Sequence, residues 1–275
     1  MKNLFRLSLV SVMMICFAAC ALATVKDGDD AMKKGKYRDA IKQYDAYLKK
    51  NPKDDKVMLK IAGAYESAKW FGQSVQWWDK YIKQFPKGGG IKDAKKHSAE
   101  NHRWLGVNFY NNLGESPRIA VEHLQKAIVL DPSLIDAYVW LGRIYMSEGD
   151  YAMAVDALSG AGRIAPDDKR VAWMQKVAKG KLENGGAAYD KYEKGVVLYD
   201  KGDKPSALEQ FRGAVSDNPN FSAAHLWTAR VLYEQGSYAD SITEWQTVLK
   251  LEPDNARAAW FMKQAQQAQA KSTGK

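Results

Sequence analysis

Apolar residues recur along most of this chain at spacings of three and four, which is the period of an amphipathic α-helix. The periodic stretches come in pairs, and a short turn that often contains glycine separates the two members of a pair. Three of the gaps between pair-closing prolines measure 34 residues, and a fixed period of this length predicts an array of stacked helical hairpins. The closing prolines are Pro52, Pro86, Pro132, Pro166, Pro219 and Pro253.

The stretch from 127 to 142 shows why the helices stop at these prolines. Its residues would form one apolar helix, but Pro132 stands in the middle. Proline has no amide hydrogen and its ring clashes with the preceding turn, so a helix ends before it. We therefore predict that one helix ends near Leu130. The next helix is expected to begin two residues after the proline, with the Asp136 carboxylate in its first turn, where negative charge is favourable.

Residues 135–168 carry the clearest copy of the repeat, and they resemble the tetratricopeptide repeat (TPR). The family pattern is an aromatic residue, Leu-Gly, Tyr, Ala, a large residue, Ala and a closing Pro. The resemblance implies an all-α helical-hairpin solenoid in which the first helix of each repeat lines a concave face. The matching residues are Tyr138, Leu141, Gly142, Tyr145, Ala154, Leu158, Ala161 and Pro166.

The other copies keep small residues at the points where paired helices are expected to approach closely. On the first helix these are Gly28, Ala62, Gly106, Gly195 and Ala229, and on the second helix Ala40, Ser74, Ala120, Ala207 and Ser241.

A longer period of 87 residues separates Pro132 from Pro219 and Trp173 from Trp260, which indicates that two repeats and an added segment were copied together. We expect each added segment to form a capping helix, because a solenoid must cover the apolar side of its last repeat. The predicted division is a cleaved signal peptide at 1–23, TPR pairs at 24–88, 99–168 and 188–255, a Gly/Lys-rich junction at 89–98, a capping helix and turn at 169–187, and a C-terminal capping helix and tail at 256–275.

Two glycine-containing segments are expected to interrupt the array. In PKGGGIKDAKKHS, three glycines lower helix propensity and lysines cluster, so 89–98 is predicted to be a flexible junction. The Asn-Gly-Gly sequence at 184–186 is predicted to end the first capping helix and to permit a bend.

The first residues, MKNLFRLSLVSVMMICFAACALAT, place two basic side chains before a long uncharged run. This order is typical of a secretory signal peptide that is cut after Ala23. A bacterial lipobox at 17–20, which would leave a lipidated Cys20, is an alternative, and an uncleaved anchor is another. We expect an exported periplasmic protein of a bacterial envelope, with an outer-membrane lipoprotein anchored at Cys20 as the alternative.

The net charge of +9 becomes +7 if export removes Lys2 and Arg6, leaving 39 basic residues (41 minus these two) and 32 acidic ones. A basic exported protein would be attracted to anionic lipid, acidic glycan or acidic protein surfaces, although a solvated basic surface without a target fits the same charge. Nucleic acid is not expected as a partner, because the chain would leave the compartment that holds it.

The sequence contains no phosphate-binding loop, no Gly-x-Ser-x-Gly elbow and no His-Glu-x-x-His motif. We expect no cofactor, no metal site and no enzymatic activity, with a carboxylate pair in a groove as the one catalytic arrangement that sequence would not reveal. Four scattered histidines are expected to be surface or packing residues. They are His97, His102, His123 and His225.

Outward positions of the first helices form the candidate ligand groove, and tyrosine and arginine are common anchors of interfaces. Trp140-x-x-Arg143 and Trp227-x-x-Arg230 repeat 87 residues apart, which favours two similar subsites. The competing interpretation is that both tryptophans pack between repeats while the arginines pair with nearby acids. The candidate groove residues are Arg103, Tyr110, Arg143, Met146, Tyr192, Tyr199, Arg230 and Tyr233.

These features predict a non-enzymatic scaffold that binds an extended peptide or a partner helix of another envelope protein in the groove. A module for acidic cell-wall glycan is the alternative, because the same aromatic and basic side chains could hold an acidic sugar. Chaperone-binding members of the family clamp a terminal carboxylate with Asn and basic residues, and that ligand is not expected here. The clamp position holds Asp29, Gly63, Val107, Arg143, Val196 and Arg230.

Overall fold

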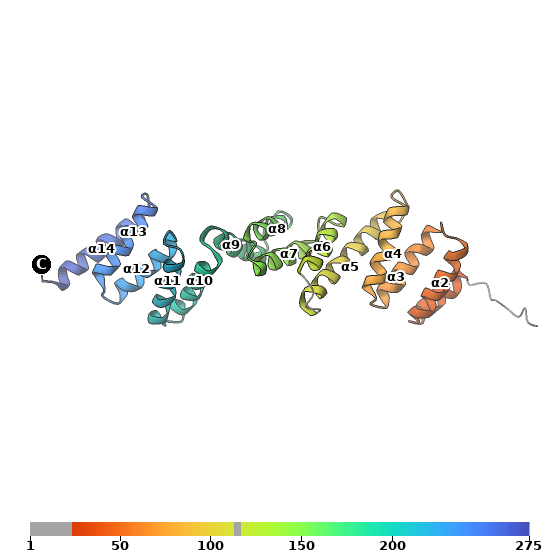
Figure 1. The fold of residues 1–275 in the computed structure, drawn as a ribbon, viewed down its shortest axis with the longest axis horizontal. Coiled ribbons are helices and arrows are strands. Elements are labelled where there is room, and N and C mark those ends of the chain that lie inside the picture. Colours follow the sequence, from red (N-terminus) through yellow and green to blue (C-terminus); the bar gives the residue numbers. More distant parts are fainter. Residues whose placement is uncertain (1–23, 113–116, 275) are drawn as a thin grey trace, which may run out of the picture. The chain divides into compact units, whose positions relative to one another are not determined.

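The computed structural model describes residues 24–112 and 117–274, and every regular element within them is an α-helix, as the sequence predicted. The predicted signal peptide at 1–23, Cys20 and both candidate cleavage sites lie outside the described residues. In Figure 1 the helices are α1 (Val25–Lys33), α2 (Tyr37–Lys50), α3 (Asp55–Ser67), α4 (Phe71–Gln84), α5 (Ile91–Asn112), α6 (Pro117–Leu130), α7 (Ile135–Glu148), α8 (Tyr151–Ile164), α9 (Lys169–Asn184), α10 (Gly186–Asp200), α11 (Lys204–Asp217), α12 (Ser222–Glu234), α13 (Tyr238–Leu251) and α14 (Ala256–Ser272).

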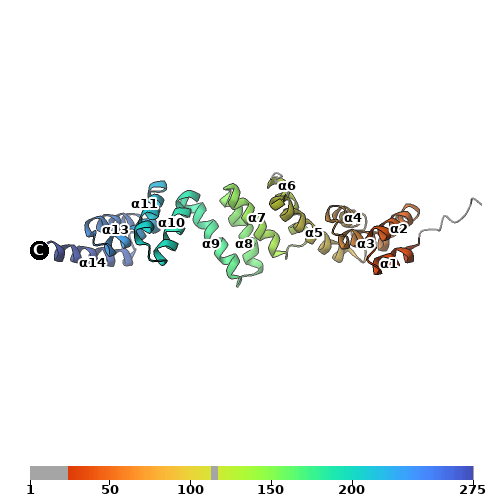
Figure 2. The ribbon, with the colours of Figure 1, turned by 90° about the horizontal axis from the view of Figure 1, so that it is seen from below.

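The chain divides into two compact units, and the boundary in sequence falls between Trp140 and Leu141, within α7. In the first unit, each helix from α1 to α6 packs on the next one along the chain, as Figure 2 shows. Small residues allow this close packing. A Cβ atom added at Gly106 would lie 2.9 Å from the carbonyl oxygen of Ala120, and Ser74 Oγ donates to the carbonyl of Ala62 at 3.0 Å.

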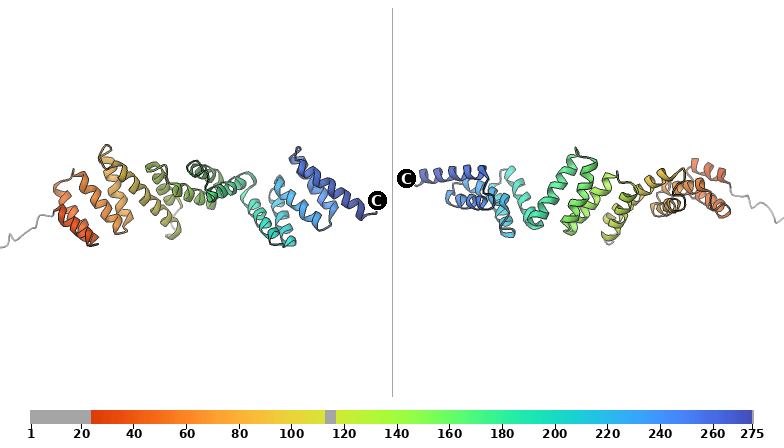
Figure 3. Two further views of the ribbon diagram at one scale, coloured as in Figure 1. Left: turned by 180° about the vertical axis from the view of Figure 1, so that it is seen from behind. Right: turned by 90° about the horizontal axis from the view of Figure 1, so that it is seen from above.

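The second unit repeats the same arrangement from α8 to α14, where successive helices pack in chain order (Figure 3). A Cβ atom at Gly195 would lie 2.6 Å from Cε1 of Phe211, and Ser241 Oγ donates to the carbonyl of Ala229 at 2.8 Å. The predicted small positions are therefore points of close helix approach in both units.

The turns also follow the sequence pattern. The break at Pro132 is confirmed, because α6 ends at Leu130 and α7 begins at Ile135. Positive φ favours glycine in the hairpin turns because other residues avoid this region, although Lys69 adopts it (φ 63°) between α3 and α4. These turn glycines are Gly35 (φ 67°), Gly149 (φ 80°), Gly202 (φ 85°) and Gly236 (φ 81°).

The prediction of a flexible junction at 89–98 is wrong for residues 91–98, which form the first two turns of α5. Ala94 is buried there, so packing outweighs the weak local propensity for helix. The glycines before this helix lie in a packed turn, where the Gly90 amide donates to the Tyr81 hydroxyl at 3.0 Å. The small size of Gly88 and Gly90 serves close packing, because an added Cβ would clash with Tyr81 or Leu59, whereas a Cβ at Gly89 would meet nothing within 4 Å.

Helices form at both predicted capping segments. The first, α9, packs on α8 and on α10, and it ends at Asn184 before Gly185 (φ 83°), which confirms the predicted end of this helix. The second, α14, packs on α13 at the C-terminal end of the second unit.

Candidate binding surface

An aromatic and cationic cluster joins α10, α11 and α12 in the second unit. The Arg230 guanidinium carbon lies 5.0 Å from the ring centroid of Tyr199 and 5.0 Å from that of Trp227. Trp227 meets Tyr199 edge-on at 4.9 Å and stacks on Phe211 at 5.5 Å between centroids. A guanidinium over two aromatic rings is attracted by their negative faces. Tyr199, Trp227, Arg230 and Glu234 are called the Arg230 cluster below.

Glu234 fixes the polar side of this cluster. Its Oε1 accepts from the Tyr199 hydroxyl at 2.6 Å and from Arg230 Nε at 3.2 Å, and its Oε2 pairs with Lys204 Nζ at 3.0 Å. Burial opposes ionisation, but these three hydrogen bonds outweigh it and hold the pKa of Glu234 below its usual value. Burial, together with the bond to Glu234, raises the pKa of Tyr199. Arg230 thus stacks on two rings and also pairs with an acid.

Tyr192 lies among other rings rather than on an open surface. Its centroid is 5.0 Å from that of Phe221, 5.8 Å from that of Tyr189 and 6.2 Å from that of Phe211. Burial raises the pKa of its hydroxyl. Much of its ring is therefore covered by packing between α10, α11 and α12. Tyr192 exposes less surface to a ligand than its sequence position suggested.

The other candidates of the second unit lie on α7 and α12. Arg143 is exposed and Met146 is half-buried on α7. Tyr233, on α12, meets Tyr238 edge-on at 5.6 Å and packs beside the core around Trp245.

Two candidates, Arg103 and Tyr110, lie on α5 in the first unit. Arg103 Nε pairs with Glu100 at 3.0 Å, and Tyr110 meets Trp140 edge-on at 6.5 Å between centroids. The eight candidates are thus divided between the units, and a single groove through all of them stays a prediction.

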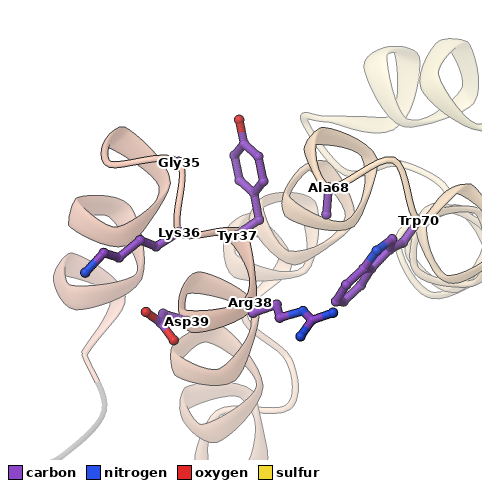
Figure 4. Close-up of a pocket in the computed structure, with 7 residues that line it drawn as sticks. All are labelled: Gly35, Lys36, Tyr37, Arg38, Asp39, Ala68 and Trp70. Atoms are coloured by element: carbon purple, nitrogen blue, oxygen red, sulfur yellow. The ribbon is translucent and has the colours of Figure 1, made fainter.

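The first unit has a cavity of about 470 Å³ beside two hairpin turns, which sequence reasoning missed. Figure 4 shows the Arg38 side chain extending toward Trp70, and its guanidinium carbon lies 5.2 Å from the indole centroid. The volume is in the range of small-ligand sites. The sequence feature that could have indicated this cavity is the aromatic or basic residue next to each of the two turns. The cavity is lined by Gly35, Lys36, Tyr37, Arg38, Asp39, Ala68 and Trp70.

A polar network between α4, α5 and α6 was also missed. The Nδ1 atoms of His102 and His123 are 2.7 Å apart, and His102 Nε2 lies 3.3 Å from Asp79 Oδ2. Asp79 also accepts from Ser98 Oγ at 2.7 Å and pairs with Lys126. Burial would raise the pKa of Asp79, but its bonds to His102, Lys126 and Ser98 hold the pKa well below the usual range.

Over residues 24–112 and 117–274, no group of three or more His, Cys, Asp or Glu side chains is arranged to hold a metal ion. In the same part of the chain, no helix combines the length and apolar character needed to cross a membrane.

Among curated proteins, the DnaJ homolog subfamily C member 7 homolog of Dictyostelium discoideum is 22% identical over 213 residues. The match covers 70% of this chain and 36% of the relative, so this chain spans about a third of that protein's length. Among solved structures, MamA is 22% identical with a TM-score of 0.38, and the match covers 70% of this chain and 88% of MamA. YrrB, described as a TPR protein with an unusual peptide-binding site, is 14% identical with a TM-score of 0.33 and coverages of 80% and 97%.

Two models of the tetratricopeptide repeat match the sequence, one at residues 26–88 and 192–256 and the other at 135–168. Together the matched segments cover more than half of the chain. They coincide with helical hairpins of the structure, in which small residues and turn glycines stand where the repeat requires them. This chain therefore belongs to the tetratricopeptide repeat family.

Proposed function

We propose that this protein is a non-enzymatic scaffold for protein–protein interaction, and that the Arg230 cluster is where it binds an extended peptide or a partner helix. The observation that carries the proposal is the position of Arg230, which lies 5.0 Å from two ring centroids while Glu234 accepts from its Nε. Side chains held in this way lose little conformational freedom on binding, and that lowers the entropic cost of association. Arginine, tyrosine and tryptophan are also the residues most enriched among interface anchors.

The chemistry of the cluster indicates how a peptide would be held. Arg230 uses Nε for Glu234, and its terminal nitrogens would donate to peptide carbonyl or carboxylate oxygens. The rings of Tyr199 and Trp227 would contact apolar side chains of the ligand. Because the Tyr199 hydroxyl already donates to Glu234, the ring of Tyr199 rather than its hydroxyl is the expected contact.

We place this scaffold in a bacterial envelope, exported to the periplasm, with other envelope proteins as its partners. The start of α1 supports a cut after Ala23. Thr24 would then be the first residue, and it caps α1 by accepting from the Asp27 amide at 3.2 Å while Asp27 accepts from Thr24 in return. Lipidation at Cys20 is the alternative, and the mass of the mature N-terminus would decide between the two.

The combined variant Tyr199→Ala, Arg230→Ala and Tyr233→Ala tests binding at the Arg230 cluster and the adjacent groove residue Tyr233. In-cell crosslinking followed by mass spectrometry should lose the native partner, while circular dichroism should show little change in helix content. Arg212→Ala is the matched control, because Arg212 is an exposed arginine of α11 outside the cluster. Undiminished crosslinking of the same partner by the triple variant would rule out this surface.

A second candidate function is the binding of an acidic cell-wall glycan in the cavity beside Trp70. The Arg38 guanidinium over the indole favours it, because a sugar could contact the aromatic ring while the cation pairs with a carboxylate. Acidic cell-wall fragments should then quench tryptophan fluorescence in the native chain and not in Trp70→Ala. Equal quenching of both proteins would exclude the cavity as the sugar site.

A further inference from the structure

Helices α9 and α14 carry the same exposed pattern, Arg-x-x-Trp-x-x-Lys, at positions related by the 87-residue period. Residues three apart on a helix lie close together on one side, so each pattern forms a single stripe. All six side chains are exposed. The Trp173 stripe consists of Arg170, Trp173 and Lys176, and the Trp260 stripe consists of Arg257, Trp260 and Lys263.

Packing does not account for the two tryptophans. Trp173 is 59% exposed and Trp260 is 56% exposed, whereas Trp78 and Trp245 are 5% and 1% exposed in the cores of their units. A single exposed hydrophobic side chain is common in soluble proteins. Here two exposed indoles stand 87 residues apart at equivalent positions, each between two cations, and this repetition points to one kind of ligand for both.

The stripes are kept in both copies although inward and other exposed positions of the two helices differ, such as the exposed pair Lys179 and Gln266. Val171 corresponds to Ala258 and Met174 to Phe261, so two inward positions have changed between α9 and α14. A third inward position is alanine in both helices. The exposed Arg, Trp and Lys are identical in both copies. Retention of an exposed stripe while inward residues change indicates that the stripe has a role in binding rather than in folding.

The charges around the stripes define the kind of ligand. Six residues of helix place the two cations of a stripe about 9 Å apart along the axis, on either side of the indole. Acidic side chains limit each stripe at its N-terminal end: Asp168 lies 3.6 Å from Arg170 in the first, and Asp254 precedes Arg257 in the second. Each stripe is thus bounded at one end by an acid, which suits a short polypeptide segment better than the wide basic field that binds an anionic bilayer.

We propose that the Trp173 and Trp260 stripes are two equivalent docking sites for acidic peptide segments, in which an apolar side chain lies between two carboxylates. The apolar side chain contacts the indole, and the carboxylates pair with Arg and Lys. Exposed ion pairs are individually weak, so a partner that carries two such segments gains most from the pair of sites. The stripes share no residue with the Arg230 cluster, and the proposal does not depend on that cluster.

The test uses a synthetic helical peptide of about 18 residues that carries Glu-x-x-Leu-x-x-Glu, with a Gln-for-Glu peptide as its control. The indole N–H signals of Trp173 and Trp260 in the ¹H–¹⁵N NMR spectrum of the full chain report on each site, and Trp173→Phe and Trp260→Phe assign them. We expect the Glu peptide to shift both signals and the Gln peptide to shift neither. Sodium chloride at about 0.5 M should abolish the effect, because salt screens exposed charges.

Reversal of the charges in both stripes is the most discriminating experiment. The combined variant Arg170→Glu, Lys176→Glu, Arg257→Glu and Lys263→Glu should prefer a Lys-x-x-Leu-x-x-Lys peptide over the Glu peptide by about tenfold or more. The matched control Arg212→Glu with Lys250→Glu also reverses exposed cations of the second unit, on α11 and α13, and it should bind like the native chain. The triple variant of the groove should bind like the native chain as well, which separates this proposal from the proposed function.

Three results would overturn the proposal. The first is a failure of the Glu peptide to move either indole signal. The second is an equal response to the Glu and Gln peptides. The third is a response to phosphatidylglycerol vesicles or to an acidic oligosaccharide but not to the Glu peptide, which would assign the stripes to a lipid or a glycan surface.

Discussion

The Nδ1 atoms of His102 and His123 lie 2.7 Å apart, so one ring donates a proton that the other accepts. Burial lowers the pKa of His123 below its usual value near 6.5; the charges of His102 and Lys126 lower the pKa further, against opposing effects of Glu122 and Asp79. When both rings are protonated, two donors face each other and the contact becomes repulsive. Because the folded state resists a proton that the unfolded state accepts, this stabilisation is present above pH 6.5 and is lost as the pH falls below it.

We therefore expect the amides of α4, α5 and α6 to be less protected at about pH 5 than at about pH 7, after correction for intrinsic exchange rates. Hydrogen exchange with mass spectrometry on the full chain measures this. His123→Phe keeps an aromatic ring beside Phe109, on which His123 stacks at 5.3 Å, and removes the titrating nitrogen. The acid sensitivity should disappear in this variant, and its persistence would contradict the assignment to the His102–His123 pair.

His225 should give the second unit the opposite response. Its Nδ1 lies 2.6 Å from Glu244 and its Nε2 lies 2.9 Å from the Pro219 carbonyl, so both nitrogens face acceptors. The bond to Glu244 raises the pKa of His225 above 6.5, and the Pro219 carbonyl adds to this against the effect of burial. A raised pKa gives stability that is fully present below pH 6.5 and is lost as the pH rises through the folded value.

In the same exchange experiment, α12 and α13 should be more protected at about pH 6 than at about pH 8. His225→Gln keeps a polar side chain that does not titrate, so its protection should be nearly constant over this range. Greater protection of native α12 at the higher pH would show that His225 is not held as the charged form.

Two glycines of the first unit should respond in opposite directions to the same substitution. In Gly106→Ala, the new Cβ would lie 2.8 Å from Leu124 Cγ and 2.9 Å from the Ala120 carbonyl oxygen, so α5 and α6 must separate. We expect a loss of about 1–3 kcal/mol in the free energy of unfolding. Gly63→Ala meets nothing within 4 Å in the interior of α3, and helix propensity should add up to about 1 kcal/mol. Urea denaturation followed by circular dichroism compares the two, and equal effects would contradict the close approach.

The Gly106 contact was predictable because the repeat itself requires a small residue where two paired helices cross. The residue pattern of the repeat aligns Gly106 with Gly28 and Gly195, where an added Cβ would likewise meet Tyr44 and Phe211. Periodicity and proline positions likewise gave the hairpins and their ends. Features that recur in every repeat are thus visible in one sequence, since each copy supports the alignment of the others.

Features that depend on one particular set of neighbours were not visible. The His102–His123 contact needs side-chain directions from two helices, which no spacing in the sequence encodes. The glycines and lysines around Ala94 suggested a flexible segment, but Ala94 is buried and its segment is helical. For Arg230 the sequence offered either a groove residue or a local ion pair, and the structure shows the pair with Glu234 together with stacking on two rings.

Trp78 and Trp245 fill the same position of their repeats but differ in the state of the indole nitrogen. Trp78 Nε1 donates to Glu66 Oε2 at 3.2 Å, whereas Trp245 Nε1 is buried with no hydrogen-bond partner among the described residues. Replacement by Phe removes a similar volume at both sites, so the loss of packing should be similar. At Trp245 the substitution also removes an unsatisfied buried donor, which costs about 1–3 kcal/mol, while at Trp78 it breaks a hydrogen bond.

We therefore expect Trp245→Phe to lower the free energy of unfolding by less than Trp78→Phe does, with a difference of about 1–2 kcal/mol. Urea denaturation followed by far-ultraviolet circular dichroism is the suitable measurement, because it does not depend on the fluorescence of the ring that is replaced. Trp245→Ala is the control for packing, and it should be strongly destabilising, because it also removes the ring that stacks on Phe261 at 5.4 Å. An equal or larger loss in Trp245→Phe than in Trp78→Phe would mean that the buried indole N–H of Trp245 contributes to stability.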